Sequence, residues 1–111
     1  MDDKQVVVVS KDLIMPYFEK WDVLKLEIQR RYDEKEESAL EWMAIAIENY
    51  EELLKVSAPA GGTDRRTKME PLNGEERLQF VKDKVISPFA LIQLNLLYTE
   101  LRKKVARFIK N

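Results

Sequence analysis

The stretch that decides the fold is SPFALIQLNLLYTELRKKVARFIK, residues 87–110. Ser87 can cap a helix with its hydroxyl, and Pro88 fits the first helical position because no amide hydrogen is needed there. Residues 89–98 are apolar on nearly every side, which predicts that this half of the helix lies buried among other helices. Apolar residues then continue at steps of three and four, as is typical of a helix with one buried side. The stripe consists of Leu94, Leu97, Tyr98, Leu101, Val105, Phe108 and Ile109.

The opposite side of this predicted helix is basic. Lys103, Arg107 and Lys110 share it, and two further cations lie at its margins, Arg102 and Lys104. Such a face can bind phosphates without distinguishing bases. Alternatively, the cations only complement the helix dipole and keep the helix end hydrated. The sequence leaves both interpretations open.

Similar periodicity upstream predicts three more helices. The first carries the stripe Ile14, Tyr17, Trp21, Leu24, Ile28 and Tyr32. Ser38 with Glu41, and Asn73 with Glu76, have the spacing at which a capping residue and a glutamate begin a helix. We therefore expect helices near 13–35, 39–56, 75–86 and 88–110, the last two either separate or one helix kinked at Pro88. The predicted fold is all-α, a compact four-helix bundle in a single domain, residues 1–111.

Two segments do not fit the helical pattern. Residues 1–11 form a predicted extended tail, and we expect its four valines, Val6 to Val9, to lie against the bundle or a neighbouring subunit. Residues 57–74 form a flexible basic loop that is long for a bundle connection. This loop contains Arg65, Arg66 and Lys68. It is either a linker or a second place where phosphates bind.

The composition argues against catalysis. The chain has no cysteine and no histidine, which removes thiolate chemistry, the commonest general base and the commonest transition-metal ligand. The best carboxylate cluster is Glu48, Glu51 and Glu52, and glutamates one turn apart are usually a solvated helix face. We expect no enzyme activity, no cofactor, no metal and no small-molecule substrate. With no apolar run of membrane-spanning length and no signal-peptide pattern, we expect a cytoplasmic protein without membrane contact.

Charge is divided unevenly along the chain. Residues 1–60 contain 14 acidic and 8 basic side chains, whereas residues 61–111 contain 6 acidic and 11 basic ones. In a folded bundle the two halves attract each other. The same asymmetry also suits assembly of copies through opposite charges, or a polyanion on one side.

In length, helicity, charge layout and lack of catalytic groups, the chain resembles the small helical subunits of CRISPR Cascade-type effector complexes. That resemblance implies a noncatalytic part in an antiviral nucleoprotein complex, beside larger protein subunits and copies of itself. The predicted function is to hold the DNA or RNA backbone on basic residues. The alternative is a protein-only adaptor or self-assembling subunit. The candidate nucleic-acid-binding residues are Arg65, Arg66, Lys68, Arg102, Lys103, Arg107 and Lys110.

Overall fold

The computed structural model describes residues 10–57 and 69–109, and in these two ranges the chain forms four α-helices and no β-strand. The helices are α1 (Lys11–Asp33), α2 (Ser38–Ser57), α3 (Gly74–Asp83) and α4 (Pro88–Ala106). The predicted all-α four-helix bundle is confirmed. A turn after Asp83 separates α3 from α4, so they are two helices and not one helix kinked at Pro88.

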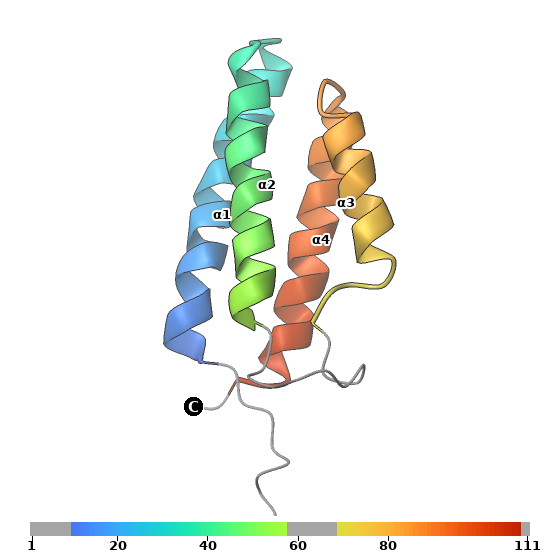
Figure 1. The fold of residues 1–111 in the computed structure, drawn as a ribbon. Helices are drawn as coiled ribbons and strands as arrows, with labels where there is room; N and C mark the ends of the chain where they lie inside the picture. The colour runs from blue at the N-terminus through green and yellow to red at the C-terminus, as the bar shows by residue number, and fades with distance from the viewer. Residues whose placement is uncertain (1–9, 58–68, 110–111) are drawn as a thin grey trace, which may run out of the picture.

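The helices pack as two antiparallel hairpins (Figure 1). α1 packs on α2, and α3 packs on α4. α4 also contacts both α1 and α2 and therefore joins the two hairpins. Because the helices alternate in direction, α2 and α4 run the same way, and α1 begins at the end of the bundle where α4 ends (Figure 1).

Local signals set the starts of α1 and α4. Ser10 caps α1 by accepting a hydrogen bond from the amide of Leu13 at 3.4 Å. Ser87 caps α4 by accepting one from the amide of Phe89 at 3.2 Å, with Pro88 at the first helical position as predicted. α1 begins at Lys11, before the expected start, and Pro16 lies inside it.

The side-chain capping predicted for Ser38 and Asn73 is wrong. The Ser38 hydroxyl accepts a hydrogen bond from Arg31 at 2.6 Å and donates one to Glu36 at 3.1 Å. The side chain is therefore engaged with the α1–α2 turn. Asn73 precedes α3 but has a positive φ of 55°, and its side chain makes no capping hydrogen bond. Asparagine tolerates this left-handed conformation better than most residues, which suits it to the turn.

The core lies between α1, α2 and α4. It includes Trp21, Leu24 and Ile28 from the predicted stripe of α1, whereas Tyr17 and Tyr32 are only partly buried and Phe18 takes a core position. Ile47 and Leu94, the expected central positions, are both buried. The prediction that residues 89–98 are buried on nearly every side is wrong. α4 has neighbours on only part of its circumference, and Phe89 is 68% exposed.

A buried polar network links the three central helices. The hydroxyl of Tyr98 donates to the carbonyl of Ala46 at 2.6 Å and accepts from the amide of Asn49 at 3.0 Å. The Tyr98 ring stacks on Trp21 with ring centroids 4.1 Å apart. Hydrogen bonds and ring stacking fix the register of α4 against α1 and α2.

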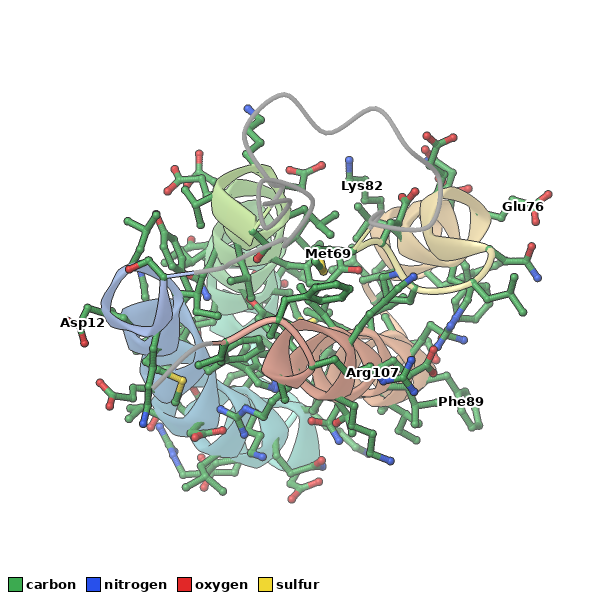
Figure 2. All side chains as sticks on the ribbon, turned by 90° about the horizontal axis from the view of Figure 1, so that it is seen from below. Asp12, Met69, Glu76, Lys82, Phe89 and Arg107 are labelled. Atoms are coloured by element: carbon green, nitrogen blue, oxygen red, sulfur yellow. The ribbon has the colours of Figure 1, made fainter. Side chains whose placement is uncertain are left out.

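The predicted tail and loop lie mostly outside the described residues. Where these two segments join the helices, their residues belong to the described structure. Residue 11 starts α1, residue 57 ends α2 and residue 74 starts α3. Met69 is buried in the core beside the helices, as Figure 2 shows. The C-terminal end of the predicted flexible loop is therefore part of the packed structure.

Candidate functional site

One face of α4 is the candidate site. Phe89, Ile92 and Leu96 project from it and are 68%, 55% and 44% exposed. Steps of three, four and seven residues then bring Lys103 and Arg107 to the same side of the helical repeat, and both are exposed. We call these five residues the α4 outer face. Figure 2 shows Phe89 at the surface, away from the core.

The outer face has an apolar half and a basic half. Its apolar half lies in the N-terminal part of α4 and its basic half at the C-terminal end. Lys103 and Arg107 make no ion pair with another described residue, although Lys103 lies close enough to Glu100 to help lower the pKa of that carboxyl. These cations therefore add positive charge at a helix end that carries a partial negative charge.

Arg102 has a different environment from the other predicted cations. Its guanidinium bonds to Asp22 of α1 at 3.2 Å and lies over the ring of Phe18, 4.6 Å from the ring centre. Its Nε atom is buried without a hydrogen-bond partner among the described residues. Arg102 thus connects α4 to α1, and these contacts would have to be rearranged for its guanidinium to bind a phosphate.

Other basic residues are likewise engaged within the fold. Lys104 donates a hydrogen bond to the carbonyl of Glu70 at 3.2 Å. Arg31 lies over the Trp42 ring at 4.5 Å from its centre and pairs with Glu36 at 3.2 Å. Lys104 and Arg31 therefore do not extend the pair Lys103 and Arg107 into a larger basic surface.

Four predicted nucleic-acid-binding residues lie outside the described residues. They are Arg65, Arg66, Lys68 and Lys110. Their role stays a prediction. Of the seven candidates, the structure places Lys103 and Arg107 together on the outer face and places Arg102 against α1.

An apolar groove lies at the end of the bundle where the α1–α2 turn approaches the start of α4. It encloses about 740 Å³. Its lining combines apolar side chains with a charged rim: Tyr32, Lys35, Glu36, Glu37, Ala39, Leu40, Glu41, Ile86 and Pro88. The hydroxyl of Tyr32 donates to the carbonyl of Val85, which ties the two hairpins together beside the groove. A groove of this size and apolarity can take an inserted side chain from another molecule.

A clamp between α3 and α4 fixes one flank of the outer face. Arg77 of α3 binds both carboxylate oxygens of Glu100, at 2.7 and 2.8 Å, and binds Gln93 at 2.8 Å. These hydrogen bonds from Arg77 hold the pKa of Glu100 below its ordinary value, although partial burial opposes the change. The clamp positions α3 beside the outer face and leaves the face itself uncovered.

Among the described residues, no group of three or more acidic, histidine or cysteine side chains is arranged to hold a metal ion. The Glu48, Glu51 and Glu52 cluster does not form such a site, and Glu51 pairs with Lys82 of α3 at 2.8 Å. Within the same residues, no helix combines the length and apolarity needed to cross a membrane.

The fold and these side chains define a helical bundle with an exposed face, half apolar and half basic, on its central helix. A comparison with protein-family models matches residues 11–110 to the YpoC-like protein family, and the chain belongs to that family. No curated protein and no solved structure matches the chain. The family match does not link the chain to CRISPR effector complexes, so that resemblance stays a prediction.

Sequence reasoning missed the apolar half of the site because the same residues look like core. Phe89, Ile92 and Leu96 recur at helical spacing, but buried positions surround them in the repeat. One signal was present: Leu94, Leu97, Leu101 and Val105 already form a complete buried stripe. The large apolar residues outside that stripe were candidates for exposure.

Proposed function

We propose that the chain is a noncatalytic interaction subunit that binds a partner protein through the α4 outer face. The observation that carries this proposal is the exposure of Phe89, Ile92 and Leu96 on the helix whose other side builds the core. Contiguous exposed apolar side chains bordered by polar ones typically mark binding surfaces. Burying a large apolar side chain completely is worth about 1.5–3 kcal/mol, so three partly exposed ones can contribute substantially to binding.

The basic half of the face supports the same function. Lys103 and Arg107 border the apolar half and favour a partner with acidic residues at the corresponding level. Charges at the border of an interface mainly set orientation and association rate, whereas a central apolar cluster supplies most of the affinity. The face has both components on a single rigid helix.

The double variant Ile92→Asp/Leu96→Asp tests this function. Both side chains are exposed, so we expect the variant to fold. We also expect it to lose association with copies of itself, measured by sedimentation velocity, and with any partner protein that copurifies with the wild-type chain. Val23→Asp is the matched control, because Val23 is a 69% exposed apolar residue on α1. We expect the control to behave as wild type. The proposal fails if the double variant keeps every interaction of the wild-type chain.

A second candidate function is contact with a nucleic-acid backbone. The observation that favours it is the exposure of Lys103 and Arg107 without ion pairs to other described residues. In a salt titration, reversing both to glutamate should weaken binding to all sequences alike. It should also reduce the log–log salt slope by roughly 0.7–0.9 for each lost phosphate contact. An unchanged slope would exclude these two residues as phosphate contacts.

A further inference from the structure

The outer side of α2 mirrors the α4 outer face with the opposite charge. Leu40 and Ile45 are 36% and 43% exposed in the N-terminal half of α2. Glu48 and Glu52 follow in its C-terminal half, and both are exposed. Neither glutamate forms an ion pair with another described residue. Because they lie four residues apart, the two carboxylates repel each other on the same side of the helix.

The α2 and α4 faces share one order along the bundle. Each has exposed apolar residues in its N-terminal part and ends with two charges four residues apart, negative in α2 and positive in α4. The N-terminal part of the α2 face also carries the exposed Glu41. Since both helices run the same way, the charged halves lie toward the same end of the molecule (Figure 1). On the outer side of α2, one cation follows the Glu48 and Glu52 pair. It is Lys55, in the last turn of the helix.

The two faces point away from each other. The hydrogen bond from Tyr98 to Ala46 lies between α2 and α4. In the helical repeat, Glu48 lies on the side of α2 opposite Ala46, and Leu96 and Lys103 lie on the side of α4 opposite Tyr98. A second copy shifted sideways without rotation would therefore place its α2 face against the α4 outer face of the first. This contact is heterologous and can repeat.

Resting on the function proposed for the α4 outer face, we infer that its partner is the α2 face of a second copy of this chain. Placing Lys103 opposite Glu48 and Arg107 opposite Glu52 satisfies both charge pairs at once, because both spacings are four residues. This register brings Leu96 to the level of Glu41, whose neighbours along the same side of α2 are Leu40 and Ala44. Phe89 then lies at the level of the apolar groove at the start of α2.

The geometry favours a protein copy over a nucleic acid as the occupant. A nucleic-acid backbone matches Lys103 and Arg107 but offers nothing that requires the apolar half of the face. The α2 face offers Glu48 and Glu52 to the basic half and the exposed Leu40 to the apolar half. The net charge of −1 also permits copies to associate without strong overall repulsion.

Two charge-reversed chains test this inference when they are mixed. In Lys103→Glu/Arg107→Glu both faces are acidic, and in Glu48→Lys/Glu52→Lys both faces are basic. We expect wild type to associate with rising concentration at low ionic strength and each variant alone to stay monomeric. The equimolar mixture should associate again, because every contact then joins an acidic face to a basic one. Sedimentation velocity measures association, and circular dichroism verifies folding.

The outcomes separate this inference from the proposed function. A mixture that stays monomeric, or a wild-type chain that never associates, overturns the inference. If Glu48→Lys/Glu52→Lys associates normally while Ile92→Asp/Leu96→Asp does not, the α4 outer face remains a binding surface with another partner. If none of these variants changes any interaction, both proposals fail. If the mixture stays monomeric while nucleic acid binds the wild-type chain and not Lys103→Glu/Arg107→Glu, the basic half binds phosphates.

Discussion

Two buried tyrosines, Tyr50 and Tyr98, differ in the hydrogen bonding of their hydroxyl groups. Tyr50 and Tyr98 are both inaccessible, and their rings meet edge to face at 5.2 Å. Burial raises the pKa of each phenol. The Tyr98 hydroxyl bonds to Ala46 and Asn49, whereas the Tyr50 hydroxyl has no partner among the described residues. Their contributions to stability should therefore have different magnitudes.

Replacing each tyrosine by phenylalanine measures that difference. We expect Tyr98→Phe to lower the free energy of unfolding by about 1–3 kcal/mol, because the carbonyl of Ala46 loses its side-chain donor. Tyr50→Phe removes a polar group that has no bond to lose, so it should leave stability unchanged or raise it by up to about 1 kcal/mol. Urea unfolding of both variants gives the comparison. Equal losses would mean that the hydrogen-bond network does not stabilise the bundle.

At the scale of one helix, α4 combines a core side with a binding side. Leu94→Ala should cost roughly 2–5 kcal/mol, since Leu94 is completely buried. Ile92→Ala, two residues away on the exposed side, should change stability by no more than about 0.5 kcal/mol. Thermal or urea unfolding of the two variants tests this assignment. A large loss from Ile92→Ala would place that side chain in the core and remove it from the outer face.

Periodicity predicted which residues of each helix face the core, but it did not predict how many sides of a helix have neighbours. The stripe from Leu94 to Val105 was correct because three- and four-residue spacing fixes a direction on the helix. Exposure of Phe89 depends on where α1 and α3 lie around α4. That placement depends on contacts such as Arg77 with Glu100, which join residues far apart in the sequence.

The candidate site shows the same limit for charged residues. Lys103, Arg107 and Arg102 look alike in sequence, yet only the first two belong to the outer face. Arg102 bonds to Asp22, 80 positions away, and lies over Phe18. The capping role expected of Ser38 was likewise replaced by a bond to Arg31 from the preceding helix. Sequence spacing cannot show such long-range partners.

At the scale of the whole molecule, the acidic and basic halves of the chain contribute their charges to different helices. The acidic half includes the outer side of α2, and the basic half includes the C-terminal end of α4. The internal pair of Glu51 with Lys82 uses part of this complementarity, at 2.8 Å. Glu48 and Glu52 of α2 and Lys103 and Arg107 of α4 lie on opposite sides of the bundle. These two pairs of opposite charge suit repeated side-by-side contact.

Hydroxyl-radical footprinting of the wild-type chain tests whether the α4 outer face is the contact surface, because oxidation reports side-chain exposure residue by residue. We expect oxidation of Phe89 and Leu96 to fall when the protein is concentrated at low ionic strength. Oxidation of Leu72, which is 81% exposed and lies off the outer face, should stay constant. Unchanged oxidation of Phe89 and Leu96 under conditions in which the chain associates would show that the contact lies elsewhere and that the α4 outer face is not the binding surface.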